Sequence, residues 1–421
     1  MYQVQNSQAL VAAHRRLFGR RRARTVVAPT VVLLGLTSLF TDISSEMVST
    51  ILPLYLVYTV GLSPVAFGLV DGLYQGGGAL VRVASGFVGD KFRRHKEVAV
   101  VGYGLSAVCK LGFLVVGGAV GALSSIIVLD RTGKGIRTAP RDAMISLSTP
   151  REQLGTAFGV HRALDTTGAM LGPLLAFGML ALAPGRFDAI FVVSFCVALV
   201  GLGILVLLVQ NQRDDRPADE APAVSLRSAA RLLESRKFTL VIAIGCLLGL
   251  ATMSDGFVYV GLQHRLGFET RFLPLLYVGT SVVYMLLAVP VGKLADKLGR
   301  LKIFVAGYLL LLALYATILV PNLTPVALVG CLVLFGLYYA ATDGVLMAIS
   351  SALLPEETRG SGLALVTTGT TLARLFGSLA FGALWTFAGL NVAVIVFIAA
   401  LSTGIVVTAI AGRGVARATN A

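Results

Sequence analysis

The segment VGKLADKLGRLK, residues 291–302, is a short charged break between two long apolar runs. A similar segment, SGFVGDKFRRHK, occupies residues 85–96 and also separates two apolar runs. The two segments align with Asp90 opposite Asp296, at an offset of 206. The match indicates that the two parts of the chain are related.

A second pair of segments supports the same internal repeat. STPREQLGTAFG at 148–159 resembles LLPEETRGSGLA at 353–364, with Pro150 opposite Pro355 at an offset of 205. Two matches at nearly one offset predict a duplicated chain. Parallel repeats joined by a linker are a known plan of membrane transporters.

The composition is that of a membrane protein. The chain has 421 residues, of which 56% are hydrophobic and 13% are charged, and its mean hydropathy is +0.84. Soluble domains carry about 25% charged residues. The apolar runs are continuous and many reach the length that crosses a bilayer, whereas a β-barrel needs short alternating segments.

The predicted fold class is therefore an all-α membrane protein with twelve transmembrane helices in two pseudo-symmetric bundles of six. The expected spans are 30–57, 63–88, 97–119, 121–146, 154–181, 188–210, 238–263, 271–296, 301–320, 324–353, 357–387 and 389–411. The expected organisation is a basic N-terminal segment at 1–29, bundles at 30–210 and 238–411, a linker with an amphipathic helix at 211–237, and a tail at 412–421.

The distribution of Lys and Arg predicts the orientation. The net charge of +14 gathers on alternate connections between spans, which is the positive-inside pattern and not the sign of a nucleic-acid partner. Both termini are expected in the cytoplasm of a bacterial cell, with the chain in its inner membrane. The four cysteines stand singly in apolar runs, so neither a metal site nor a cofactor is expected.

The opening segment resembles a motif of the major facilitator superfamily, G-x-x-x-D-R/K-x-G-R-R/K, which lies between spans 2 and 3 and again between spans 8 and 9. The resemblance covers the whole chain and implies two six-helix bundles that rock about a central site. An Asp at a helix end can pair with Arg and so hold one conformation, although a plain basic loop is the alternative. The expected latch residues are Gly86, Asp90, Lys91 and Arg94 in the first copy, where Arg93 replaces the glycine, and Gly292, Asp296, Lys297, Gly299 and Arg300 in the second.

Span 4 contains VLDRTGKGIRTAPRDAMI, residues 128–145, with six charges on about 140° of a helix surface. Such a stripe must face a cavity or paired partners, because charges facing lipid cost several kcal/mol each. Arg131 to Gly135 also resembles the superfamily's R-x-x-x-G motif, whose Arg is implicated in proton transfer in drug/proton exchangers. The whole string is similar to a bacterial branch of predicted efflux permeases. A salt bridge at a helix end is the alternative for Arg141 and Asp142.

Acidic residues inside the spans predict a proton-coupling site. Asp42 and Glu46 share one helix face in span 1, and a structural role as partners of a span-4 Arg is the alternative. The expected proton-coupling residues are Asp42, Glu46 and Arg131, with Arg131 paired to one of the two acids. The substrate cavity is expected to add Lys134, Arg137, Asp165 and Asp255. Further charges inside the predicted spans are Asp71, Arg82, Asp343 and Arg374.

Span 5 contains a partial antiporter motif. Gly168, Gly172 and Pro173 resemble the g-x-x-x-G-P-x-x-G-G pattern of exporters in this superfamily, but Ala176 and Phe177 replace its closing glycines. Ordinary helix packing is the alternative, because small residues let spans approach closely.

These observations predict a secondary active transporter that works by alternating access, as a proton-coupled exporter of a small molecule. Its expected partners are the substrate, protons and the lipid bilayer, and it is expected to be a monomer and not an enzyme. Uptake or exchange of an organic anion is one alternative, and a non-transporting sensor on the same fold is the other.

Overall fold

The computed structural model describes residues 28–78, 81, 94–116, 119–149, 154–210, 232–320, 324–354 and 359–412. Across these ranges the regular secondary structure is helical. Nine of the described helical segments are long and apolar enough to cross a membrane. The prediction of an all-α membrane protein is therefore confirmed.

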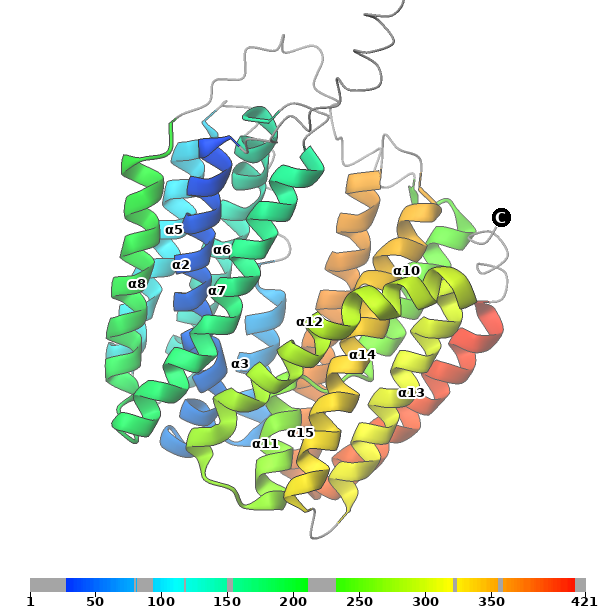
Figure 1. Ribbon diagram of the computed structural model, residues 1–421. Coiled ribbons are helices and arrows are strands. Elements are labelled where there is room, and N and C mark those ends of the chain that lie inside the picture. Colours follow the sequence, from blue (N-terminus) through cyan, green and yellow to red (C-terminus); the bar gives the residue numbers. More distant parts are fainter. Residues whose placement is uncertain are drawn as a thin grey trace, which may run out of the picture.

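The first half of the chain forms one group of helices (Figure 1). Helix α2 packs against α7 and α8, and α5 packs against α6. Because α2 contains Pro53, its last turn widens into a π-helical segment before the chain turns into α3. The elements are α2 (Pro29–Leu54), η1 (Tyr55–Thr59), α3 (Pro64–Gly76), α5 (His95–Val115), α6 (Val120–Leu147), α7 (Leu154–Leu182) and α8 (Phe187–Leu207).

The second half forms a second group, with α12 running obliquely between the two groups (Figure 1). Helix α15 runs through both of the last two predicted spans and is interrupted at Gly389, whose φ of 84° only glycine adopts readily. The elements are α10 (Arg236–Leu250), α11 (Asp255–Leu266), η4 (Thr270–Phe272), α12 (Leu273–Leu298), α13 (Arg300–Leu319), α14 (Pro325–Ala352) and α15 (Arg359–Ala411).

The span predicted over 238–263 corresponds to one candidate membrane span, Arg236–Leu266, but the helix within it is interrupted. The helix ends at Leu250 and restarts at Asp255. The Ser254 side chain caps the new helix by accepting from the backbone N–H of Phe257, and the N–H of Met253 donates to the Tyr315 hydroxyl at 2.6 Å. Apolar composition continues through the break, so only the Ser-Asp capping signal marked it in the sequence.

The two halves touch from the middle of the helices to one end, which we call the closed end. Helix α3 lies along α15 so closely that a Cβ on Gly68 would stand 2.6 Å from the carbonyl oxygen of Ser378. At the rim of this end the N–H of Val65 donates to the Thr386 hydroxyl at 2.9 Å. All hydrogen bonds and ring contacts between the halves that involve described residues lie in this region.

Candidate functional site

A buried charge cluster joins α5 and α6. The carboxylate of Asp130 accepts from the Lys110 ammonium at 2.5 Å and from the Ser106 hydroxyl at 2.7 Å. Its second oxygen accepts from the Arg131 guanidinium at 2.5 and 3.0 Å. All three charged residues are less than a tenth exposed. One buried acid therefore compensates two buried cations.

This cluster contradicts the expectation that Arg131 pairs with Asp42 or Glu46. Arg131 turns back along its own helix to Asp130, and its other face lies 3.9 Å from the centre of the Tyr74 ring. The sequence prediction overlooked Lys110, although a Lys inside an apolar span is itself a signal that a buried acid lies nearby.

A second cluster joins α2, α6 and α7 around two acids. The carboxyl groups of Asp42 and Asp165 lie close together and interact electrostatically. The guanidinium of Arg137 lies 3.5 Å from Asp42, and that of Arg141 lies 3.7 Å from Asp165. Two adjacent carboxylates repel each other, which favours a state in which one of them carries a proton. We call these four residues the acid-pair cluster.

The acid-pair cluster continues toward one end of α6. Arg141 pairs with Asp142 at 2.9 Å and donates to the Ser38 hydroxyl at 3.3 Å. Ser38 in turn hydrogen-bonds to Nε2 of His161 at 3.0 Å. The salt bridge considered for Arg141 and Asp142 is therefore present, and it belongs to a wider network.

Glu46 of α2 and Lys134 of α6 lie about one helical turn from the acid-pair cluster. Glu46 accepts from the Ser49 hydroxyl at 2.7 Å, one turn along α2 from the acid pair. The charge of Lys134 interacts with those of Asp42 and Glu46. No carboxylate in the described part of the chain lies within ion-pair distance of the Lys134 ammonium.

Asp255 lies in the other half and does not join these clusters. It begins α11 and accepts from the Tyr339 hydroxyl. Its neighbour across the halves is Asp71 of α3, which accepts from the Ser378 hydroxyl at 2.8 Å. Asp71 therefore helps to hold the closed end.

The described residues include the second copy of the predicted latch and only Arg94 of the first. Asp296 pairs with Arg300 at 3.0 Å across the turn at Gly299, whose φ is 103°. Arg300 also donates to the carbonyl oxygen of Ala348 in α14 at 3.3 Å. Gly292 and Lys297 lie on the last turns of α12 beside this pair. Of the first copy, Gly86, Asp90 and Lys91 fall outside the described residues, as does Arg82, and Arg94 directly precedes α5.

The glycines of the antiporter-like motif bring α7 against α2. A Cβ on Gly168 would lie 2.4 Å from the carbonyl oxygen of Leu39, and one on Gly172 would lie 2.7 Å from that of Ile43. Pro173 stands within the same helix. This close approach supports the packing interpretation, and it places Asp165 beside Asp42.

The described residues contain no group of three His, Cys, Asp or Glu side chains arranged to hold a metal ion.

Comparisons with known proteins agree on one family. The family model for the Major Facilitator Superfamily matches residues 34–280 and 261–415. The chain is similar to the uncharacterized MFS-type transporter MJ1317 of Methanocaldococcus jannaschii, with 32% identity over 84% of this chain and 88% of the relative. It is 26% identical to the uncharacterized protein Rv2265 of Mycobacterium tuberculosis, over 84% of this chain and 86% of that one.

Solved structures share the fold at low sequence identity. The nucleoside transporter NupG superposes with a TM-score of 0.73 and 14% identity, over 92% of this chain and 99% of NupG. A bacterial homologue of the human lysosomal transporter Spinster, in an inward-facing and unoccupied conformation, gives a TM-score of 0.66 and 14% identity, over 93% of this chain and 95% of that one.

Proposed function

Because the chain belongs to the major facilitator superfamily, we propose that it is a proton-coupled secondary active transporter that exports a small molecule across a bacterial cytoplasmic membrane. Its fold is that of membrane transporters in this superfamily. The proton gradient supplies the energy, at about 2.3 kcal/mol per proton for each 100 mV of membrane potential.

The observation that carries the proposal is the close approach of the Asp42 and Asp165 carboxyl groups, with an arginine beside each. A proton held by this pair would link α2 to α7, and the nearby Arg137 and Arg141 come from α6. When the proton leaves, two adjacent carboxylates repel each other and bind the arginines more strongly. The packing of three helices then depends on proton occupancy, which is the property that a coupling site requires.

The charge pattern supports an orientation for the closed end. Helix α12 ends in the basic segment that begins α13, at the end opposite the closed end. Basic connections stay in the cytoplasm, so we infer that the closed end faces outward. A transporter that alternates must break the contacts of Asp71 and Ser378 to open outward.

The export direction is taken from the antiporter-like motif and from the resemblance of span 4 to efflux permeases. Lys134 favours a second candidate function, which is uptake or exchange of an organic anion. Its ammonium has no carboxylate partner within ion-pair distance in the described part of the chain, so an anionic substrate could supply one.

The test is a strain that lacks the gene and a strain that overexpresses it, compared by untargeted metabolomics of cells and medium. Export predicts a compound that accumulates in the medium on overexpression. The Asp42→Asn variant should lose this effect, while Asp188→Asn, in an exposed ion pair with Arg186, should keep it. Depletion of the compound from the medium on overexpression would instead support uptake.

A further inference from the structure

A cavity of about 110 Å³ lies among α10, α13, α14 and α15, all within the second half of the chain. We call it the C-half cavity. It is separate from the acid-pair cluster, which lies on α2, α6 and α7. Its lining includes Phe304, Tyr308, Asp343, Thr371 and Arg374.

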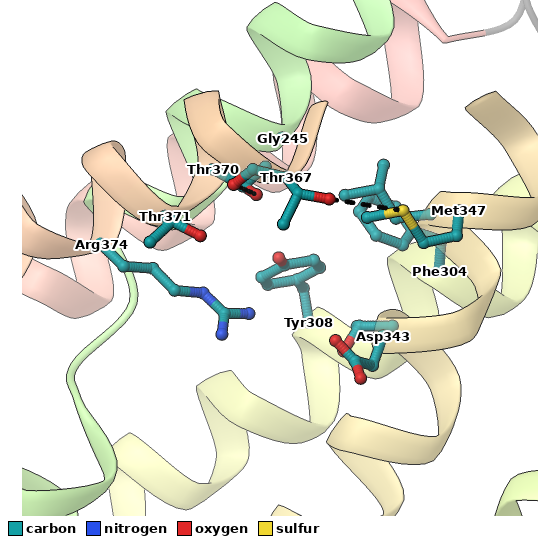
Figure 2. Close-up of a pocket in the computed structure, with 11 residues that line it drawn as sticks. Gly245, Phe304, Tyr308, Asp343, Met347, Thr367, Thr370, Thr371 and Arg374 are labelled. Atoms are coloured by element: carbon teal, nitrogen blue, oxygen red, sulfur yellow. Dashed lines mark hydrogen bonds between the residues drawn. The ribbon is translucent and has the colours of Figure 1, made fainter. Parts of the chain in front are cut away.

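The two charges of the C-half cavity form no ion pair with any residue in the described part of the chain. Figure 2 shows the guanidinium of Arg374 and the carboxylate of Asp343 on different sides of the Tyr308 ring. Neither charge has an ion pair or a hydrogen bond to another described residue, although Arg374 interacts electrostatically with Asp343, with Asp255 and with three neighbouring tyrosines. Both lie within candidate membrane spans. Unpaired charges at membrane depth are costly and mark functional sites, so a ligand or water must satisfy them.

The chemistry of the lining selects the kind of ligand. An anion alone would pair with Arg374 but would be repelled by the negative Asp343. A cation alone would pair with Asp343 but would be repelled by Arg374. A molecule with both charges satisfies both residues at once. The hydroxyl of Thr371 donates no hydrogen bond to a described residue and is therefore available to the same ligand.

The size of the cavity limits the bound part. At about 30 Å³ for each water molecule, the space equals roughly three to four waters, which suits a glycine-sized zwitterion. Asp343 is exposed while Phe304 is buried, so the cavity opens at Asp343 and closes toward Phe304. The remainder of a larger substrate would extend out of the cavity on the side of Asp343.

We propose that the C-half cavity binds the zwitterionic head group of the transported molecule, with its ammonium on Asp343 and its carboxylate on Arg374. The physiological role rests on the proposed transport function, but binding itself is measured without a gradient. A failed binding test would therefore leave proton-coupled transport standing, and a failed transport test would leave the binding result standing.

The experiment is equilibrium dialysis of the purified full-length protein in detergent with radiolabelled glycine, alanine and β-alanine. Unlabelled acetate and methylammonium serve as single-charge competitors. We expect at least one zwitterion to bind, and each single-charge competitor to bind at least tenfold more weakly. The Arg374→Gln and Asp343→Asn variants should each lose about tenfold or more in affinity, because each loses a charge-assisted hydrogen bond.

Matched controls come from the exposed ion pair of Arg186 and Asp188. The Arg186→Gln and Asp188→Asn variants make the same chemical changes and should bind as the wild type does. If Arg374→Gln fails to fold, Thr371→Val provides a milder variant that should weaken binding several-fold. Absence of zwitterion binding at about 10 mM, equally tight binding of acetate, or unchanged affinity in Asp343→Asn would each overturn the proposal.

Discussion

Replacement of Asp130 by Asn should be one of the most damaging single changes in the first half of the chain. The substitution keeps the shape and can still accept from Ser106, but it removes the only acid that contacts Lys110 and Arg131 among the described residues. Removing one partner of a buried ion pair costs about 3–5 kcal/mol. At about 2–4 °C per kcal/mol, the melting temperature should fall on the order of 10 °C.

The companion change Lys110→Met separates charge from packing. Alone it leaves Asp130 paired with Arg131, so its cost should be much smaller. Added to Asp130→Asn it removes one of two uncompensated cations and should recover about 1 kcal/mol or more of the loss. The assay is size-exclusion chromatography in detergent after heating, with Asp188→Asn as an exposed control whose melting should not change. A melting temperature for Asp130→Asn within about 2 °C of the wild type, or no recovery in the double variant, would refute this electrostatic account.

Three further outcomes are expected. Infrared difference spectra at neutral pH should contain the band of a protonated carboxyl group, and Asp42→Asn and Asp165→Asn should each remove it. A band that survives both changes would show that the proton lies elsewhere. Gly68→Val should push α3 away from α15. A membrane-impermeant reagent should then label a cysteine placed at Ser378 faster, in a background without the native cysteines. Unchanged labelling would contradict the close contact. Gly168→Val should abolish folded protein on size-exclusion chromatography, because its side chain would meet the backbone of α2, and normal yield would argue against that approach.

The membrane class and most helix positions could be predicted because they follow from long apolar runs and from the repeat. The boundary of the last two spans was predicted near Gly389, where the structure interrupts α15. The break before Asp255 was not predicted, because apolar composition continues through Ala251–Met253 and a four-residue irregular segment barely changes hydropathy. Hydropathy therefore locates spans better than it locates interruptions within them.

The sequence analysis named Asp42, Asp165 and the charges of span 4, but it overlooked Lys110 and did not predict which residues pair. The stripe of charges on span 4 was correctly read as needing partners, yet the partner of Arg131 is its own neighbour Asp130 together with Lys110 of another helix. Helical periodicity places residues on a face of one helix. It does not say which other helix packs there, so Asp165 beside Asp42 required the three-dimensional structure.

The central claim is that the carboxyl pair of Asp42 and Asp165 couples proton movement to transport. The most direct test is the proton flux that the substrate drives in proteoliposomes, followed with a pH-sensitive dye in the lumen. The wild type should move protons only when substrate is present. The double variant Asp42→Asn with Asp165→Asn should still exchange substrate between the two sides but should move no protons. Undiminished substrate-driven proton flux in the folded double variant would contradict the account.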